Sequence, residues 1–204
     1  EIYRIMEASF PDDEYRPYEE QLALFEEPEY GIYYMPIGSE SLESQVPDSA
    51  LKDKPAGFLA IWEFAEFIFI EHFAVNPKLR NSGTGSGMLQ ELVKLSKKPV
   101  CLEVELPDAE LARRRIGFYE RNGFVFNDYP YMQPPISKGK SPVPLRIMTY
   151  GKAVSQEEFK EAFSKALTLN RPVVIDCQID SDDKVWPMVA PGAAISEAFD
   201  EDDM

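Results

Sequence analysis

The hydrophobic positions of the chain follow two periods, one typical of strands and one typical of helices. The runs 55–64 and 66–75 are rich in aromatic and aliphatic residues, and their short connection predicts an antiparallel hairpin. Beyond Gly87, apolar residues recur at helical spacing: Met88, Leu89, Leu92, Val93 and Leu95. This spacing predicts an amphipathic helix. The same reasoning predicts strands at 31–35, 99–106, 123–126 and 145–150, and helices within 1–27, at 108–121 and at 155–169.

The order of these elements predicts the fold class. Strands alternate with helices along most of the chain, so we expect a mixed sheet covered by helices on both faces. The helical region within 1–27 should break at Phe10-Pro11, because the residue before a proline avoids the helical conformation. Residues 36–54 are rich in Ser, Gly, Pro and Asp and are predicted to form a loop.

Composition and charge exclude several classes of function. The formal net charge of −15 argues against nucleic acid as a partner. No run approaches the roughly eighteen apolar residues of a membrane span, and no secretory signal is seen, so we expect no membrane partner. Cys101 and Cys177 lie in apolar runs and are interpreted as reduced core residues of a cytoplasmic protein. Since His72 is the single histidine, a metal site is not expected.

One part of this acidic chain is basic. From Lys78 to Arg121 there are nine Lys and Arg against six Asp and Glu, a net charge of +3. Such a segment suits a small polyanion, for example a phosphorylated cofactor. A solvated helix face would explain the same charges equally well.

The glycine-rich segment 80–87 is the main candidate for cofactor binding. A phosphate-binding P-loop ends in Gly-Lys-Ser/Thr, and no lysine follows these glycines. The dinucleotide fingerprint fits Gly83 and Gly85, but its third glycine would be Met88. An acidic residue does follow about twenty positions on, so this fingerprint stays a minor alternative.

A third motif, Arg-x-x-Gly-x-Gly between a strand and a helix, fits the same segment. Arg80, Gly83 and Gly85 occupy its positions, with Val75 and Pro77 just upstream. Here the chain resembles the GNAT superfamily of N-acetyltransferases. The resemblance implies an α+β fold with a mixed, mostly antiparallel central sheet flanked by helices. It also implies acetyl-CoA as co-substrate.

Physical chemistry supports a pyrophosphate at this turn. Glycines allow positive φ angles, so successive backbone N–H groups can converge on an anion, and the helix that follows adds its unpaired N–H groups. The resemblance further implies that the backbone at 73–75 pairs with the pantetheine arm and donates to the acetyl carbonyl. The resulting cofactor-binding residues are Phe73, Ala74, Val75, Arg80, Asn81, Ser82, Gly83, Thr84, Gly85 and Ser86.

A second segment, 115–124, resembles the family signature Phe-Tyr-x-x-x-Gly-Phe. In that family the tyrosine commonly protonates the departing thiolate of coenzyme A, which gives this role to Tyr119. A pKa near 10 suits the role, since the hydroxyl stays protonated at neutral pH. The alternative is that Tyr119 is a core aromatic like its neighbour Phe118.

The acceptor amine also has to lose a proton. Strict alternation within 67–75 would place Phe69, Glu71 and Phe73 on one face and Ile70, His72 and Ala74 on the other. Glu71 lies where family members often carry an acid that receives the amine proton, directly or through water. His72 is an alternative base from the opposite face, and Glu71 as a surface acid fits the sequence about as well.

The resemblance covers about residues 3–159 and extends to a bacterial subgroup of undefined substrates. From about Leu167 the chain instead resembles the C-terminal end of acetolactate synthase catalytic subunits, in which this piece ends the cofactor domain. The metal-diphosphate motif and the activating glutamate of that family are absent here, so the tail alone should not bind thiamine diphosphate. We therefore expect an acetyltransferase domain at 1–154, and at 155–204 a helix followed by an extra strand and arm.

The leading hypothesis is an enzyme. It would move an acetyl group from acetyl-CoA to a primary amine of a small molecule or peptide by direct attack. The alternative is a non-catalytic acetyl-CoA-binding module whose tail mediates association with acetolactate synthase subunits or self-association, for example as a homodimer.

Overall fold

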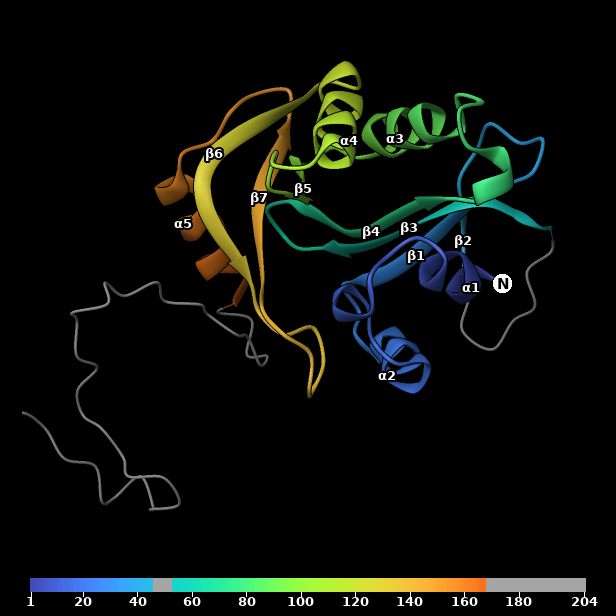
Figure 1. The fold of residues 1–204 in the computed structure, drawn as a ribbon, viewed down its shortest axis with the longest axis horizontal. Coiled ribbons are helices and arrows are strands. Elements are labelled where there is room, and N and C mark those ends of the chain that lie inside the picture. Colours follow the sequence, from blue (N-terminus) through green and yellow to red (C-terminus); the bar gives the residue numbers. More distant parts are fainter. Residues whose placement is uncertain (46–52, 168–204) are drawn as a thin grey trace, which may run out of the picture. The chain divides into compact units, whose positions relative to one another are not determined.

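The computed structural model of the protein describes residues 1–45 and 53–167. Within these ranges a seven-stranded sheet has the order β2-β1-β3-β4-β5-β7-β6 (Figure 1). The strands are β1 (Tyr30–Pro36), β2 (Glu43–Ser44), β3 (Pro55–Glu63), β4 (Ile68–Val75), β5 (Val100–Glu105), β6 (Phe124–Gln133) and β7 (Val143–Tyr150). Of the described strand pairs, β4–β5 is parallel and the others are antiparallel. The predicted α+β class with a mixed, mostly antiparallel sheet is confirmed.

Helices cover both faces of this sheet. They are α1 (Ile2–Glu7), α2 (Tyr18–Ala23), α3 (Thr84–Leu95), α4 (Glu110–Arg121) and α5 (Gln156–Leu167), with short 3-10 turns at Asp12–Glu14, Leu24–Glu26 and Pro77–Leu79. In Figure 1, α3 and α4 lie on one face of the sheet, while α1 and α2 lie on the other. None of the described helices is both long and apolar enough to span a membrane.

Three apolar clusters hold these layers together. The largest joins α3 and α4 to one face, a second joins α1 to the opposite face of β1 and β3, and a third joins α5 to β4, β5 and β7. The close approach of α3 depends on Gly57, because a Cβ there would lie 2.7 Å from the Ala74 carbonyl oxygen and 2.8 Å from the Met88 sulfur. The contact with Ala74 lies within the sheet and the contact with Met88 lies between the sheet and α3, so a side chain at this position would force both to shift.

The register of β4 contains a β-bulge that strict alternation does not predict. Against β3, Ala60 pairs with His72 but Ile61 pairs with Ile70, so Glu71 is the extra residue. As a result Ile70 and Phe73 both join the cluster with α3 and α4, whereas Ala74 joins the cluster with α1. The predicted division of 67–75 into two alternating faces is therefore wrong, since a bulge reverses the side-chain direction along a strand.

Most predicted elements are present, with differences at their ends. The predicted loop 36–54 contains β2, and β6 continues to Gln133 instead of ending at residue 126. Helix α3 begins at Thr84 because Gly83 has a φ of 86° and ends the preceding turn, so the last glycines lie within the helix. The extra strand and arm predicted after the helix of 155–204 lie outside the described residues, and the change of resemblance near Leu167 falls at their limit.

Candidate active site

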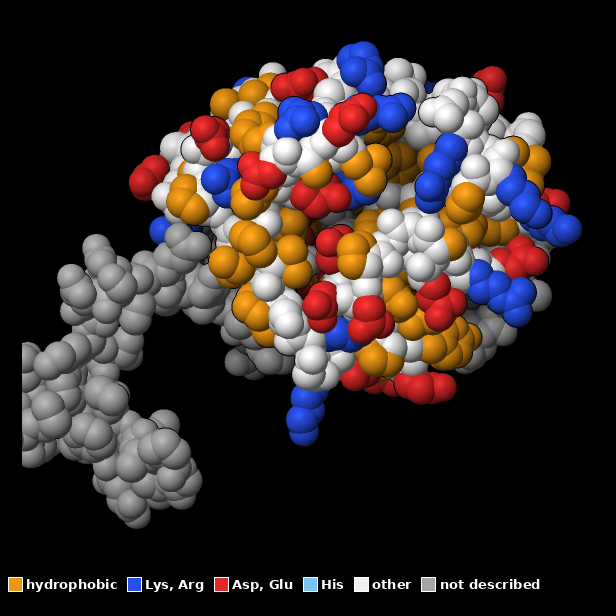
Figure 2. All heavy atoms as spheres, in the orientation of Figure 1, with side chains coloured by type: hydrophobic (Ala, Val, Ile, Leu, Met, Phe, Trp, Pro, Cys, Tyr) orange, Lys and Arg blue, Asp and Glu red, His pale blue; other side chains and the backbone are white. Residues whose placement is uncertain are grey.

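A cavity opens where β4 and β5 separate. The two strands pair only from Ile68 to Ile70 and from Val100 to Leu102, and beyond these residues they diverge. The cavity has a volume of about 970 Å³ and is lined by β4, β5, the glycine turn, α4 and the segment before α2. Figure 2 shows the molecule hollowed on this face, with acidic side chains within and below the hollow.

One end of the cavity is formed by the glycine turn before α3. Asn81 and Gly83 have φ angles of 63° and 86°, conformations that Asn tolerates and Gly adopts freely. Gly83 is the N-cap of α3 and provides no side-chain cap, so the first N–H groups of this helix are left for another acceptor. A cradle of this kind fits a phosphate or pyrophosphate.

The turn can lie this close to its neighbours because of Gly85. A Cβ at that position would lie 3.3 Å from both the Phe118 ring and a Val75 methyl group. At Gly83, in contrast, a Cβ would meet nothing within 4 Å, which leaves the cavity side of the turn open. The residues predicted for the cofactor that line the cavity are Phe73, Ala74, Val75, Arg80, Asn81, Gly83, Gly85 and Ser86.

Ser82 and Thr84 are not among the lining residues. Their hydroxyl groups lie 2.8 Å apart, and the Ser82 hydroxyl donates to the Leu79 carbonyl at 2.6 Å. These contacts stabilise the conformation of the turn.

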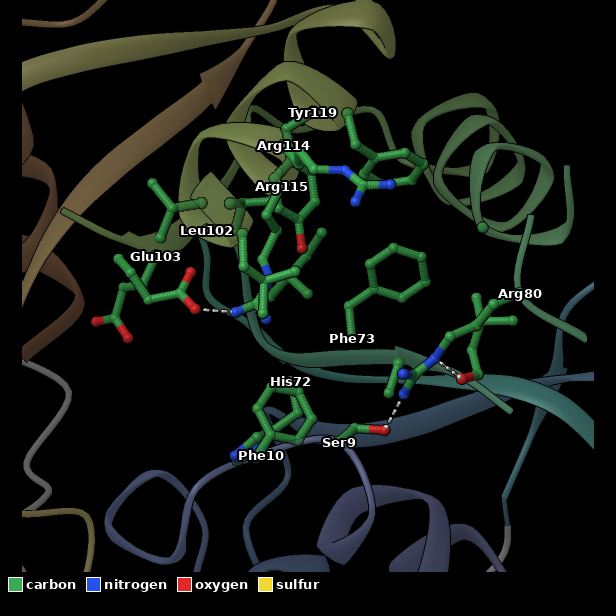
Figure 3. Close-up of a pocket in the computed structure, with 18 of the residues that line it drawn as sticks. Ser9, Phe10, His72, Phe73, Arg80, Leu102, Glu103, Arg114, Arg115 and Tyr119 are labelled. Atoms are coloured by element: carbon green, nitrogen blue, oxygen red, sulfur yellow. Dashed lines mark hydrogen bonds and ion pairs between the residues drawn. The ribbon is translucent and has the colours of Figure 1, made fainter. Parts of the chain in front are cut away.

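Basic side chains surround this end of the cavity. Arg80 donates to the Val75 carbonyl at 3.3 Å and to the Ser9 hydroxyl at 3.0 Å (Figure 3). Arg113, Arg114, Arg115 and Arg121 of α4 also line the cavity. Five of the nine basic residues of the segment 78–121 are therefore cavity residues, whereas its four lysines are not among the lining residues.

Tyr119 reaches the cavity from α4. Its ring is 7% exposed and lies 5.3 Å from the Phe118 ring and 6.4 Å from the Phe73 ring, centroid to centroid. Burial raises the pKa of the hydroxyl well above its ordinary value, although Arg115 partly opposes this. No described residue makes a hydrogen bond with the hydroxyl, which is thus a protonated group able to donate into the cavity.

Glu71, at the bulge, is an ionised and fully engaged carboxylate. Arg16 donates to both of its oxygens at 2.9 Å, and Trp62 Nε1 donates to Oε1 at 3.1 Å. Burial by itself would raise the pKa of Glu71, but the Arg16 guanidinium, assisted by His72, outweighs burial and lowers it well below its ordinary value. The sequence allowed Glu71 to be either a catalytic base or an exposed surface acid. The structure excludes the second interpretation, because the side chain is buried and paired with Arg16.

Glu103 is a second carboxylate at the cavity, and no sequence motif assigns it a catalytic role. It follows Leu102, the last residue of β5 that pairs with β4, and Gln133 Nε2 donates to its Oε2 at 2.9 Å. Burial raises its pKa to about 7, an effect that a hydrogen bond from Tyr131 reduces and the Glu71 charge increases. A carboxylate inside the apolar run 99–106 was the signal that could have identified it.

The cavity connects the two faces of the sheet through the gap between β4 and β5. Leu102 and Val104 belong to the cluster with α3 and α4, whereas Cys101 belongs to a cluster on the other face. Because side chains alternate in β5, Glu103 points to the same side as Cys101. Tyr119 and the glycine turn thus approach the gap from one face, and Glu103 approaches it from the other.

Known proteins resemble this chain in sequence and in fold. Residues 48–126 match the acetyltransferase (GNAT) domain family. Among solved structures, a protein from Bacteroides thetaiotaomicron assigned to the GNAT-family acetyltransferases is 34% identical, with 82% of this chain and 88% of that chain covered and a TM-score of 0.65. A comparison with curated protein sequences gave no match.

More distant structures are also similar. The ribosomal-protein-S18-alanine N-acetyltransferase from Escherichia coli is 18% identical over 76% of this chain and 88% of its own, with a TM-score of 0.46. Arabidopsis thaliana Naa50, in complex with a bisubstrate analogue, is 17% identical over 74% of this chain and 89% of its own, also at 0.46. The match to the Bacteroides protein is much closer, and on its identity and coverage the chain belongs to the GNAT family of acetyltransferases.

Proposed function

We propose that this protein transfers an acetyl group from acetyl-CoA to a primary amine by direct attack, without an acyl-enzyme. The observation that carries the proposal is one cavity that joins the glycine turn, Tyr119 and Glu103 through the gap between β4 and β5. An anion cradle, a proton donor and a proton acceptor are the parts that acyl transfer to an amine needs.

The glycine turn and its arginines would hold the cofactor. Backbone N–H groups of the turn and of the first turn of α3 would bind the pyrophosphate, with Arg80 supplying charge. When bound, acetyl-CoA supplies an activated acetyl thioester. Beyond Ile70, β4 has no described strand partner on the β5 side, so backbone groups of 73–75 are available to donate to an acetyl carbonyl.

The proton balance assigns one role to each face. The amine nitrogen forms a bond to the acetyl carbon, the carbon–sulfur bond breaks, and the amine loses one proton. Tyr119 would give its hydroxyl proton to the departing sulfur, since its raised pKa keeps that proton in place until a thiolate forms. Glu103 would accept the amine proton, because its pKa of about 7 makes it a base matched to neutral pH.

This assignment competes with the sequence-based prediction that Glu71 is the base. Glu71 lines the same cavity, but its oxygens already accept from Arg16 and Trp62. A carboxylate whose pKa is held low has little affinity for a proton. We propose that Glu71 instead positions the bulge, and the pH dependence of activity distinguishes the two.

The proposed function is tested first by ligand-induced stabilisation. At a hundredfold excess over its dissociation constant, acetyl-CoA should raise the free energy of unfolding by about 2.7 kcal/mol. NAD and thiamine diphosphate are the controls and should give no comparable shift in the melting temperature. Stabilisation by NAD but not by acetyl-CoA would contradict the proposal.

The second measurement is release of free thiol from acetyl-CoA in the presence of primary amines. Steady-state release that depends on the amine supports an acetyltransferase. Tight acetyl-CoA binding without release by any amine would instead favour the non-catalytic binding module.

A further inference from the structure

The acceptor side of the cavity carries more negative charge than the proposed reaction requires. Four glutamates line it: Glu14, Glu71, Glu103 and Glu105. Glu71 forms an ion pair with Arg16, and Glu105 forms one with Arg115. Glu14 and Glu103 have no ion-pair partner among the described residues.

Glu14 is held in place by contacts of its own backbone and of its neighbours. His72 Nε2 donates to the Glu14 carbonyl oxygen at 2.7 Å. Lys140, from the segment between β6 and β7, donates to the Asp12 carbonyl and carboxylate, each at 2.6 Å. Two residues beyond Glu14, Arg16 makes its paired contact with Glu71. The backbone is thus anchored on both sides of a carboxylate that makes no hydrogen bond with any described side chain.

Burial of the Glu14 carboxylate costs free energy. Glu14 is half-buried, and burial, followed by repulsion from Glu105, raises its pKa, while the charges of Arg115 and His72 oppose this rise. Removing an unpaired carboxylate from water costs free energy, and such groups concentrate at functional sites. A cation beside Glu14 would offset that cost.

His72 and Gln133 also bring buried polar atoms to the cavity. His72 is 2% exposed, and its Nδ1 lies 3.4 Å from a Glu71 oxygen without a hydrogen bond to any described residue. The Gln133 Oε1 atom is buried and likewise unpartnered among the described residues. Apolar side chains of Phe10, Phe73 and Leu145 line the cavity as well.

We propose that the acceptor is a small aliphatic diamine, with one amine acetylated beside Glu103 and the second, cationic amine bound by Glu14. The proposal rests on the acetyltransferase function proposed above and extends it to a substrate class. Two carboxylates without cationic partners, in a cavity that apolar side chains also line, complement a neutral amine that gives up its proton and an ammonium group joined to it by methylene groups. An acceptor with a carboxylate in place of the second amine would be repelled by Glu14.

The experiment compares three acceptors of the same length that differ only at the far end: 1,4-diaminobutane, 1-aminobutane and 4-aminobutanoate. Thiol release is measured at pH 8. We expect kcat/KM for the diamine to exceed that of the monoamine by about tenfold, as for one charge-assisted contact, with the amino acid lowest. The preference should weaken as salt is raised, because an ion pair at a half-open site is screened.

The variant Glu14→Gln should bring the ratio of diamine to monoamine close to one. Its matched control is Glu19→Gln, which removes one negative charge from an exposed position on α2 and should keep the wild-type ratio. Stabilisation of Glu14→Gln by acetyl-CoA verifies that it is folded, and the salt dependence of the wild type tests the proposal without any variant.

The outcomes separate this inference from the function on which it rests. Equal kcat/KM for the diamine and the monoamine, or a preference that neither salt nor Glu14→Gln reduces, would overturn the role of Glu14 while the acetyltransferase function stands. Absence of thiol release with all three acceptors, together with no stabilisation by acetyl-CoA, would overturn the function itself.

Discussion

The two ends of the cavity are built from the chain in different ways. The cofactor end uses contiguous residues, from the last residues of β4 through the glycine turn to the start of α3, and its main groups belong to the backbone. The acceptor end brings together Glu14, Glu71, Glu103 and Gln133 from four separate elements, and its main groups are side-chain charges. The first end is defined by local conformation and the second by tertiary packing.

This difference determines how each end responds to change. At the cofactor end the binding groups are backbone N–H groups, whose positions depend on the local conformation. A substitution there lowers cofactor affinity when it alters φ or when its side chain fills the cradle. Side-chain charges bind through their protonation states, so the acceptor end should respond to pH, to salt and to the loss of single carboxylates. Variants at the two ends should therefore differ in the kinetic parameter that they affect.

The largest effect is expected at the turn. Gly83→Val places a β-branched side chain at a φ of 86° and directs it into the open side of the turn. We expect acetyl-CoA affinity to fall by more than about a hundredfold, equivalent to about 2.8 kcal/mol, because both the cradle and its access are lost. Isothermal titration calorimetry with acetyl-CoA measures this.

Gly87→Val is the matched control for that prediction. Gly87 lies within α3, has no positive φ, and a Cβ there would meet nothing within 4 Å. The same substitution should leave acetyl-CoA affinity within about twofold of the wild type, with only a small change in helix propensity. Equal losses in the two variants would mean that the turn is not the cofactor cradle.

The next effect is expected where the two ends meet. Tyr119→Phe removes a hydroxyl that no described residue binds, so stability should change by less than about 0.5 kcal/mol. We expect kcat to fall about a hundredfold with acetyl-CoA affinity nearly unchanged, as for a group that acts in the transition state. Tyr150→Phe, at an exposed position, serves as control. Full activity of Tyr119→Phe across the pH range would make Tyr119 a packing residue.

The same difference explains what could be predicted from the sequence. The motif residues of the cofactor end lie within eleven residues of the sequence: Val75, Arg80, Gly83 and Gly85. The strand, the turn and the helix that carry them can therefore be predicted together. The fold class follows as well, because the hydrophobic periods change from strand to helix at nearly every boundary. Local order along the chain is sufficient for this end of the cavity.

The acceptor end could not be predicted in this way. Arg16 and Glu71 are 55 residues apart in the sequence, and nothing near either residue indicates that they pair. The bulge at Glu71 depends on the register against β3, which alternation within one strand cannot show. The pKa of Glu103 rises to about 7 mainly because the side chain is buried, so this shift arises only once the sheet has formed.

A smaller effect on activity should separate the two glutamates. If Glu103 is the base, kcat/KM of the wild type rises with pH through about 7, the value to which burial raises its pKa. Glu103→Gln should lower kcat by about tenfold or more and remove that rise. A pH profile of thiol release measures both. If the rise persists in Glu103→Gln and is lost in Glu71→Gln, then Glu71 is the base, which is one of the roles that the sequence left open for it.

Glu71→Gln should mainly affect stability. It leaves the half-buried Arg16 guanidinium without its charged partner, and we expect the free energy of unfolding to fall by about 3 kcal/mol at neutral pH. The pKa of Glu71 is lower in the folded state than its ordinary 4.5, so its contribution is present above that pH and is lost as the pH falls. Urea denaturation should therefore show the difference between wild type and variant shrinking below about pH 4.5. Glu19→Gln, at an exposed site, is the control and should change stability by less than about 0.5 kcal/mol.

The smallest effect on the cavity is expected from changes at the C-terminal end of the chain. Among the described residues, none after Leu145 lines the cavity. Two truncations separate helix α5 from the residues that follow it. Ending the chain after Val154 removes Phe159 and Phe163, which contact the buried Phe67 and Phe69 cluster, and should cost about 5 kcal/mol or more in stability. Ending it after Leu167 keeps these contacts, and we expect acetyl-CoA affinity to stay within about twofold and stability within about 1 kcal/mol. Calorimetric titration, thermal denaturation and solution mass, measured on full-length and truncated proteins, test this.

If only the truncation after Val154 unfolds the protein, α5 is integral to the domain and the domain boundary lies after it. If the truncation after Leu167 also removes acetyl-CoA binding, the residues after Leu167 belong to the acetyltransferase fold, and their proposed origin in a different family is wrong.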